Sequence, residues 1–255
     1  MAEEVLNQRI GRVELITINR PEARNAINLA VAKGLESALD AAEADPDCRV
    51  VVLAAAGDKA FSAGMDLKAF AAGEIPSTER GGFAGITKRT FSKPIVCAAV
   101  GSALAGGCEV MLSCDLVVAA DSARFGIPEV SRGLIAGAGG LIKLPQRIPY
   151  ALALEMALTA EPIDAARALE VGLVNRVVPQ DQVIVEALAL AERIAKNAPV
   201  AVRVSKAVIQ ESLDLDAAAA WKLNDSRFAE VTAGPDALEG AVAFAEKREP
   251  NWTGS

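Results

Sequence analysis

Apolar residues follow one rhythm along the first two thirds of the chain and a different one after about residue 181. In the first part, short β-branched runs alternate with stretches of helical spacing such as 28–44, where apolar residues recur every three or four positions. The runs predict strands at 12–20, 49–57, 94–100 and 115–120. The last three are almost continuously apolar, which is typical of strands buried on both faces. Strands separated by helices predict an α/β domain with parallel strands.

From about Asp181 the pattern is helical throughout. Asp181 is predicted to cap the first helix of this part, and Pro199 is predicted to open the next one. We therefore divide the chain into a core, 1–195, and a C-terminal helical region, 196–255. The segment 73–85 is rich in turn residues and poor in apolar ones, so it is predicted to be the most mobile loop.

Composition narrows the class of protein. The chain has 255 residues, of which 33 are acidic and 26 basic, giving a net charge of −7. No arginine-rich stripe with interleaved aromatic residues is present, so nucleic acid is not expected as a partner. The N-terminus lacks the features of a signal peptide, and the longest uncharged stretch, 94–108, is too short to cross a membrane. We expect a cytoplasmic protein without a membrane segment.

The absence of histidine restricts the chemistry further. Catalytic triads or dyads with histidine and histidine metal sites are excluded, and the four cysteines contain no C-x-x-C pair. We therefore predict no metal site. Any proton transfer must be carried out by Asp, Glu, Lys, Tyr or Cys.

Two segments predict a buried strand that runs through small residues into a helix N-terminus. They are "KAFSAGMDLKAF", 59–70, and "GSALAGGCEVMLSCD", 101–115. Such junctions leave backbone N–H groups without partners, and two of them aimed at one point would form an oxyanion hole. The second segment also carries Glu109 in an otherwise apolar stretch. A simpler interpretation is that Glu109 is a helix N-terminal carboxylate stabilised by the helix dipole.

A third segment, "ARFGIPEVSRGLIAGAGG" at 123–140, places Glu129 after a proline, and its "GAGG" is predicted to open a helix at Leu141. Considered alone, Glu129 would be a loop residue paired with Arg124 or Arg132.

Together with "ITINRPEARNA" near the start and "AFAEKREPNW" near the end, these segments resemble the crotonase (enoyl-CoA hydratase/isomerase) superfamily over essentially the whole chain. Within it, "FSAGMDLKAFAAGE" and the C-terminal sequence are most similar to the carnitinyl-CoA dehydratase branch. The resemblance implies a spiral of ββα turns followed by a C-terminal helical trimerisation region. A homotrimer, or a hexamer made of two trimers, is the expected assembly. Apolar residues of the C-terminal helices exceed what one helical layer would bury internally and are expected to form its interface: Leu188, Leu190, Ile194, Val202, Val204 and Ile209.

The resemblance also implies roles for individual residues. Met65 and Gly106 would donate the two backbone N–H groups of the oxyanion hole. Glu109 and Glu129 would be the catalytic pair, one activating water for attack at C3 and the other supplying the proton at C2; which does which stays open. By position, coenzyme A would be bound, mainly through backbone, at Arg24, Ala26, Lys59, Ala63, Asp66, Leu67 and Lys68.

The implied activity is that of an enoyl-CoA hydratase, a hydro-lyase of fatty acid metabolism that adds water reversibly to a 2-enoyl-CoA. Carnitinyl-CoA dehydratase and Δ3,Δ2-enoyl-CoA isomerase are the alternatives, followed by a non-catalytic acyl-CoA-binding protein. Coenzyme A is part of the substrate, so no cofactor is expected, and the acyl group stays open. Two departures from the family pattern bear on the site. Ala105 stands where a glycine is usual and adds only a methyl group, and Met65 replaces a common alanine and is expected to reshape the acyl pocket.

Overall fold

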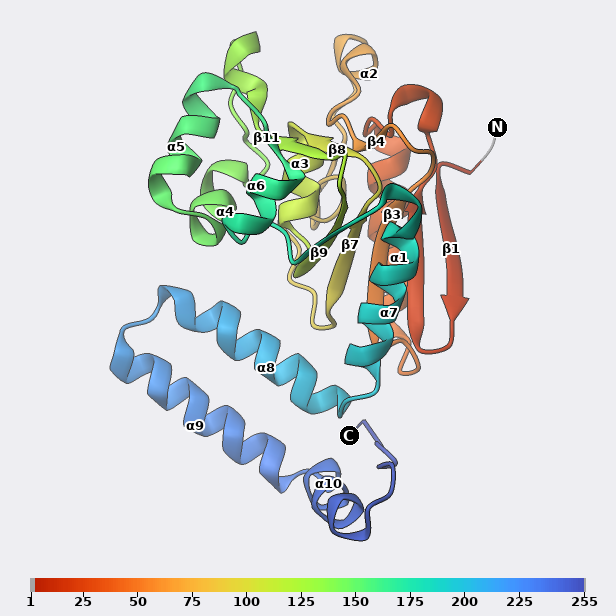
Figure 1. The fold of residues 1–255 in the computed structure, drawn as a ribbon, viewed down its shortest axis with the longest axis vertical. Coiled ribbons are helices and arrows are strands. Elements are labelled where there is room, and N and C mark those ends of the chain that lie inside the picture. Colours follow the sequence, from red (N-terminus) through yellow and green to blue (C-terminus); the bar gives the residue numbers. More distant parts are fainter. Residues whose placement is uncertain (1–2, 255) are drawn as a thin grey trace.

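The structure is a computed structural model that describes residues 3–254. Within these residues the chain forms a twisted six-stranded sheet. In spatial order its strands are β1 (Val5–Ile10), β2 (Val13–Ile18), β3 (Val50–Ala55), β7 (Ile95–Ala99), β9 (Leu116–Ala120) and β12 (Arg176–Val178). Of these strands, β1, β3, β7 and β9 are labelled from right to left in Figure 1. Only β1 runs antiparallel to its neighbour in this sheet, and the other neighbouring pairs are parallel.

A second, smaller sheet lies beyond the ends of the central strands. Its strands are β11 (Ile163–Asp164), β10 (Arg124–Gly126), β8 (Ser102–Leu104) and β4 (Ala60–Ser62). Each of β3, β7 and β9 is followed by one strand of the small sheet and then by a helical segment, so the chain makes successive ββα turns. The α/β spiral implied by the resemblance is confirmed.

Helices surround these sheets (Figure 1). They are α1 (Leu29–Ala44), α2 (Leu67–Ala71), α3 (Gly106–Leu112), α4 (Gly140–Arg147), α5 (Tyr150–Thr159), α6 (Ala165–Glu170), α7 (Val183–Ala195), α8 (Pro199–Glu211), α9 (Ala217–Ala233) and α10 (Pro235–Glu246). The side chain of Asn28 caps α1 by accepting a hydrogen bond from the N–H of Val31 at 2.8 Å. The strongly periodic elements therefore form where the apolar pattern predicted them.

The sequence pattern did not indicate β1 or the short strands. β1 lies at the edge of the large sheet and buries well only its first residue, so it lacks an apolar alternation. The strands of the small sheet are two or three residues long, which is too short for any periodicity to appear.

The segment 73–85 is not a free loop. It contains a two-stranded hairpin, β5 (Ser77–Thr78) and β6 (Gly82–Phe83), that is fastened to α1. The carboxylate of Glu36 accepts hydrogen bonds from the Oγ1 of Thr78 at 2.8 Å and from the N–H of Gly81 at 3.1 Å. A Cβ on Gly85 would lie 2.4 Å from the carbonyl oxygen of Ala32. Gly81, Gly82 and Gly85 therefore allow close packing of this segment, whereas a Cβ on Gly73 would meet nothing within 4 Å.

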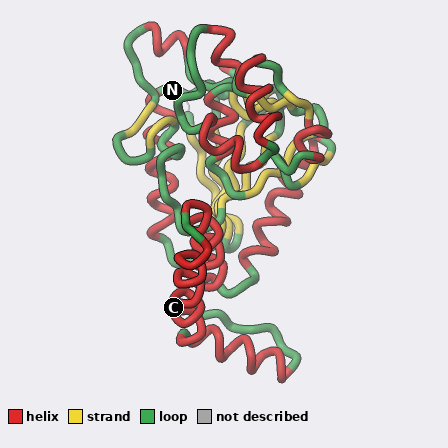
Figure 2. Tube along the Cα trace, turned by 90° about the vertical axis from the view of Figure 1, so that its left-hand side faces the viewer, coloured by secondary structure: helices red, strands yellow, loops and turns green. Residues whose placement is uncertain are grey.

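The last helices differ from the rest in position. α7 packs against the central sheet, whereas α8, α9 and α10 extend below it as an arm, which the side view shows clearly (Figures 1 and 2). Pro199 opens α8 as predicted. The predicted Asp181 cap is wrong: Asp181 lies in a 3-10 turn, Gln180–Gln182, and α7 begins after Gln182 without a side-chain cap. No helix within residues 3–254 has both the length and the apolar character needed to span a membrane.

Candidate active site

The two predicted strand–helix junctions meet at their backbones. A Cβ on Gly64 would lie 2.9 Å from the backbone nitrogen of Gly106, and a Cβ on Gly107 would lie 2.2 Å from the carbonyl oxygen of Ser62. Gly64 also has a φ of +91°, a conformation that side chains disfavour. The glycines at these positions are therefore required by backbone approach as well as by conformation.

Two backbone N–H groups remain free at this meeting point. The N–H of Ile27 donates to the carbonyl of Gly64 at 2.8 Å, and the N–H of Asp66 donates to the carbonyl of Ile27 at 2.9 Å, so the N–H of Met65 between them faces away from Ile27. Gly106 begins α3, and its N–H therefore has no carbonyl one turn earlier. Neither N–H donates to another atom of residues 3–254. The pair is available to an oxygen atom of a ligand.

Glu109 lies on the first turn of α3 and is only 3% exposed. Its Oε1 accepts hydrogen bonds from the N–H groups of Ala138 at 2.7 Å and of Gly140 at 2.9 Å. Burial raises the pKa of Glu109, while these two hydrogen bonds and the charge of Lys143 act in the opposite direction. A helix dipole alone does not account for this carboxylate, because a separate segment of the chain is built around it.

The glycines of "GAGG" explain how that segment comes so close. A Cβ on Gly140 would lie 3.1 Å from the Cγ of Glu109 and 3.2 Å from its Oε1. By contrast, a Cβ on Gly137 would meet nothing closer than 3.8 Å. Close approach to Glu109 therefore requires glycine at position 140 but not at position 137.

Glu129 lies in a 3-10 turn, Pro128–Arg132, and is half-buried. Its Oε2 is buried and has no hydrogen-bond partner among the described residues. Burial raises its pKa to about 7, and the nearby charge of Glu109 contributes to the increase. The interpretation of Glu129 as a residue paired with Arg124 or Arg132 is wrong, because neither arginine forms an ion pair with it in the described chain, and Arg124 donates to the carbonyl of Pro162 at 3.0 Å.

Alanine at position 105 has a conformational cost, because its backbone lies in a region that favours glycine. Its φ of 51° and ψ of −131° form a backbone conformation that glycine adopts readily and other residues avoid. The turn is held in place because the N–H of Ala105 donates to the carbonyl of Gly126 at 2.9 Å. The expectation that alanine adds only a methyl group was therefore incomplete, since the difference lies in the backbone.

Phe83 is a site residue that sequence reasoning missed. A Cβ on Gly106 would lie 2.7 Å from two atoms of the Phe83 ring, so this ring covers the α-carbon of the second junction. Phe83 is half-buried at the end of β6. The only signal in the sequence was a single aromatic residue within "GGFAG", which local pattern could not connect to a segment more than twenty residues away.

The residues predicted to contact coenzyme A lie around the first junction. The N–H of Ala63 donates to the carbonyl of Arg24 at 3.0 Å, which joins the first turn of the chain to the 59–68 segment. Ala26 follows Arg24 closely and is half-buried. Exposed positions surround this connection at Arg24, Lys59, Ala63, Leu67 and Lys68.

Asp66 differs from these positions because its side chain is already engaged. Its carboxylate caps α2 by accepting from the N–H groups of Lys68 at 3.1 Å and Ala69 at 3.2 Å. It also pairs with Arg20 at 3.0 Å. Burial acts to raise its pKa, but these contacts outweigh it and lower the pKa. Any contact of Asp66 with a ligand would therefore involve its backbone.

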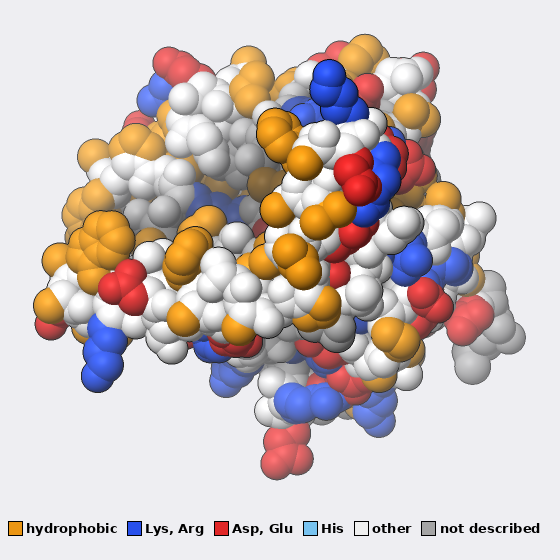
Figure 3. Space-filling view, turned by 90° about the horizontal axis from the view of Figure 1, so that it is seen from below, with side chains coloured by type: hydrophobic (Ala, Val, Ile, Leu, Met, Phe, Trp, Pro, Cys, Tyr) orange, Lys and Arg blue, Asp and Glu red, His pale blue; other side chains and the backbone are white. Residues whose placement is uncertain are grey.

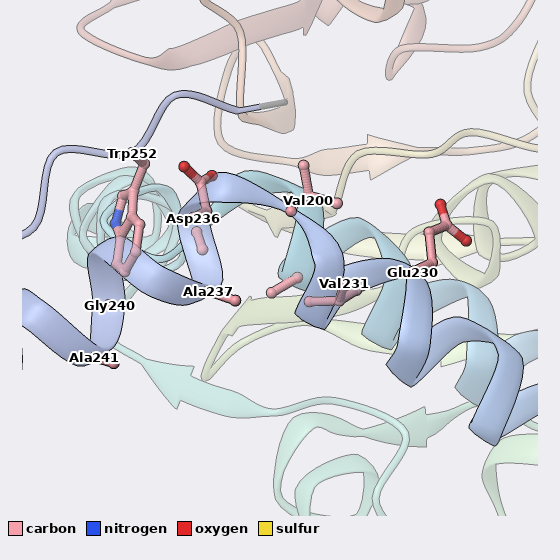
Figure 4. Close-up of a pocket in the computed structure, with 11 residues that line it drawn as sticks. Val200, Glu230, Val231, Asp236, Ala237, Gly240, Ala241 and Trp252 are labelled. Atoms are coloured by element: carbon pink, nitrogen blue, oxygen red, sulfur yellow. The ribbon is translucent and has the colours of Figure 1, made fainter.

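Two cavities lie away from this site. One, of about 300 Å³, lies between α8, α9, α10 and the C-terminal tail, where Trp252 and Asp236 border it (Figure 4). The other, of about 670 Å³, separates the core from α8. Neither glutamate lines either cavity. The candidate site is defined by its converging backbone and carboxyl groups.

Comparison with known proteins gives a consistent result. Residues 9–255 match the model of the family described as enoyl-CoA hydratase/isomerase. The carnitinyl-CoA dehydratase of Salmonella arizonae is 37% identical over an alignment of 261 residues that covers all of both chains. The corresponding protein of Proteus mirabilis is 38% identical over 251 residues, 96% of each chain.

Solved structures agree with this. The crystal structure of enoyl-CoA hydratase from Mycobacterium tuberculosis H37Rv is 47% identical, with a TM-score of 0.97 and complete coverage of both chains. The crystal structure of carnitinyl-CoA hydratase from Mycobacterium avium is 45% identical, with a TM-score of 0.82 and the same coverage. The chain therefore belongs to the enoyl-CoA hydratase/isomerase family, the crotonase superfamily whose motifs its sequence carries.

Proposed function

We propose that this protein is an enoyl-CoA hydratase that adds water reversibly across the 2,3-double bond of a 2-enoyl-CoA. One observation carries the proposal: two differently solvated carboxyl groups, Glu109 and Glu129, interact beside a pair of free backbone N–H groups. Hydration needs a base for water, an acid for carbon and a stabiliser for the enolate oxygen. The site contains a candidate for each.

The surroundings of the two carboxyl groups support a division of labour. Glu109 accepts two backbone hydrogen bonds, which favour its charged form, so it acts as the base that activates water for attack at C3. Glu129 has a buried oxygen without a partner and a pKa of about 7, so a large fraction is protonated near neutral pH. It supplies the proton to C2. This supply declines as the pH rises through about 7.

The N–H groups of Met65 and Gly106 would both donate to the thioester oxygen. Negative charge moves onto this oxygen as water adds to C3, and the two donors stabilise it because they are already oriented. Protonation at C2 returns the electrons and completes the hydration. These steps require no cofactor, since the activating group is the thioester of the substrate itself.

Coenzyme A would lie along the exposed positions around the first junction. The proposed contacts are those at Arg24, Ala26, Lys59, Ala63, Asp66, Leu67 and Lys68, mainly through backbone atoms. Met65 lies within this strip, and Gly64 beside it approaches the backbone nitrogen of Gly106, so a thioester bound along the strip would have its oxygen near both proposed donors.

Dehydration of carnitinyl-CoA is the second candidate function. It is favoured by the carnitinyl-CoA dehydratases among the relatives, which match the chain over its whole length. The chemistry is the same reaction in reverse, with a different acyl group. Isomerisation of a 3-enoyl-CoA needs only one carboxylate that moves a proton between carbons, and the retention of both glutamates argues for a hydro-lyase.

The test is an absorbance assay of the enoyl-thioester chromophore with three substrates: crotonyl-CoA, crotonobetainyl-CoA and a 3-enoyl-CoA. Loss of absorbance with the first supports the hydratase, and preference for the second identifies the dehydratase branch. A gain of absorbance with the third alone would indicate an isomerase. Tight binding of acyl-CoA without turnover of any substrate would overturn the proposal in favour of a binding protein.

We also propose that the C-terminal arm mediates assembly into a homotrimer or a pair of trimers. The space-filling view from below has several apolar side chains on the surface of this side of the molecule (Figure 3). Large apolar residues exposed on the arm are Ile209, Leu213, Leu215, Trp221, Phe228, Leu238, Val242 and Phe244. So many exposed apolar residues on adjoining helices indicate an interface.

A further inference from the structure

Lys143 is a half-buried cation that borders the cavity of about 670 Å³, and the proposed reaction assigns it no part. It lies on α4, and its Nζ donates to the carbonyl of Thr87 at 2.9 Å and to the Oγ of Ser113 at 2.8 Å. No carboxylate among the described residues lies within ion-pair distance of its Nζ. Even a half-buried lysine loses part of its hydration, so the absence of a direct counter-ion at Lys143 needs an explanation.

The contacts of Lys143 join the parts of the chain that surround Glu109. Ser113, which accepts from Lys143, donates in turn to the backbone carbonyl of Glu109 at 2.8 Å. Lys143 itself is one turn beyond Gly140, whose N–H holds the Glu109 carboxylate. Its other contact, Thr87, follows the turn that carries Phe83. One side chain thus connects α3, the start of α4 and the 82–88 segment.

The charged groups around Lys143 come from several elements. Burial lowers its pKa, and Arg147 on the same helix lowers it further. Three acidic groups act to raise the pKa of Lys143: Cys114 just after α3, Glu109 on α3, and Asp115. Asp115 is already paired with Lys206 of α8 at 2.7 Å.

Glu109 is thus the carboxylate near Lys143 that has no other cation bonded to it. The positive charge of Lys143 acts to lower the pKa of Glu109, against the effect of burial. Lys143 lies three residues after Gly140 on α4, and the N–H of Gly140 is 2.9 Å from the Oε1 of Glu109.

We propose that Lys143 is a positioning residue for the hydration step, which braces the α3–α4 junction from behind and adds a positive charge that, together with the N–H groups of Gly140 and Ala138, favours the ionised form of the Glu109 carboxylate. The proposal rests on the proposed function, because it assigns Glu109 the role of base. Lys143 does not touch the substrate and acts only through Glu109 and the backbone that holds it.

The experiment compares Lys143→Met and Lys143→Arg with the unmodified protein through the pH dependence of kcat/KM for crotonyl-CoA. A base must be ionised, so the rate falls as the pH drops through the pKa of Glu109. Removing the lysine charge raises that pKa, and the acidic limb of Lys143→Met is expected to move up by about one pH unit, with kcat lowered roughly tenfold or more and KM little changed. Lys143→Arg keeps the positive charge, so its acidic limb is expected at the same pH as in the unmodified protein.

A purely structural brace would give a different result. Lys143→Met would then lose activity equally at all pH values, with the acidic limb unmoved, and the proposal would be overturned. A shifted limb in Lys143→Arg as well would also overturn it, since the charge is retained there. Lys33→Met is the matched control, because it removes an exposed lysine from α1 and should leave the profile unchanged. If Lys143→Met does not fold, Lys143→Gln replaces it.

A measurement that needs no turnover separates this proposal from the proposed function. Carboxyl ¹³C NMR of glutamate-labelled protein, with the Glu109 signal assigned through Glu109→Gln, reports the pKa of Glu109 directly. A higher pKa of Glu109 in Lys143→Met than in the unmodified protein supports the proposed effect of the Lys143 charge even if crotonyl-CoA is not a substrate. An unchanged pKa overturns it even if the protein is an active hydratase.

Discussion

The central sheet and the C-terminal arm use apolar residues in opposite ways. Every residue of β3 and of β7 is buried, and each strand is covered on both faces. α9 buries none of its residues, although it includes Trp221 and Phe228, each 68% exposed. The core buries its apolar side chains within one chain, whereas the arm leaves apolar side chains exposed and available for contact with other molecules.

Few contacts join the two regions, and one acidic residue makes several of them. Asp115 accepts a hydrogen bond from the N–H of Ile95 at 2.7 Å within the sheet, and it binds Lys206 at 2.7 Å and Gln210 at 3.0 Å on α8. Asp115 lies six positions after Glu109, at the end of the segment 101–115 that contains the second junction. The same short segment therefore forms part of the candidate site and anchors the arm. The following predictions test how far the two regions are independent.

The largest effect is expected from the carboxyl groups inside the core. Glu109→Gln removes the proposed base and should reduce the hydratase rate roughly 10²- to 10⁴-fold, while any side activity on a 3-enoyl-CoA falls less. Glu129→Gln should suppress both activities, because a proton is transferred at C2 in each: hydration adds one there, and isomerisation of a 3-enoyl-CoA removes one and returns it to C4. Values of kcat on a 2-enoyl-CoA and a 3-enoyl-CoA check this, with circular dichroism to verify folding. Full hydratase activity in Glu109→Gln would return Glu109 to the role of a structural helix-terminal carboxylate.

A smaller loss is expected from one methyl group at the loop that holds Glu109. Gly140→Ala introduces a Cβ 3.1 to 3.2 Å from the Glu109 side chain, so the carboxylate must move by a few tenths of an ångström. We expect kcat to fall about tenfold to a hundredfold, as misplacement of a reacting group does. Gly137→Ala, three residues earlier, meets nothing closer than 3.8 Å and is the matched control. Equal activities of the two variants would show that the Glu109 contact with this loop has no role in the rate.

A change in the arm should affect assembly and leave the core folded. Phe228→Asp places a charge on the exposed face of α9 and should weaken subunit association by about 1.5–3 kcal/mol per buried ring, roughly tenfold to more than a hundredfold. Sedimentation velocity at micromolar concentration measures the association, and circular dichroism follows the core. Leu6→Asp, on the exposed part of β1, is the control. An unmodified protein that sediments as a monomer would contradict the assembly proposal.

The smallest effect concerns the turn of the second junction. Ala105→Gly releases a positive φ that costs alanine of order 1–3 kcal/mol, and the greater freedom of glycine in the unfolded chain offsets part of the gain. We expect the free energy of unfolding to rise by about 1 kcal/mol. Chemical denaturation with a constant m-value measures it. A clear loss of stability in Ala105→Gly would mean that the turn is not strained.

The predicted trimer surface shows how sequence pattern and structure diverge. Leu188, Leu190 and Ile194 of α7 were among the apolar residues that suggested an interface, but they pack against the core. The largest exposed side chains lie further along, on α9 and α10, as with Trp221 and Phe244. Periodicity identifies the apolar face of a helix, but it does not say whether the chain itself covers that face.

What the sequence by itself determined was local in character. The spacing of apolar residues located α1 and the long strands. The segments that resemble the family located the two junctions and both glutamates. Each of these features depends on residues within about fifteen positions of one another. Such features appear in the sequence because backbone conformation and the burial of one face are decided by near neighbours.

Only the tertiary structure decided the environment of the site. The N–H groups of Ala138 and Gly140 reach Glu109 across about thirty residues of sequence, Phe83 covers Gly106 from a hairpin, and Lys143 lies behind Glu109. These contacts join different turns of the spiral, and no local pattern specifies which turn will lie against which. The ionisation of Glu109 and Glu129 depends on that packing, because burial and nearby charges, and not residue type, set the pKa of a carboxyl group inside a protein.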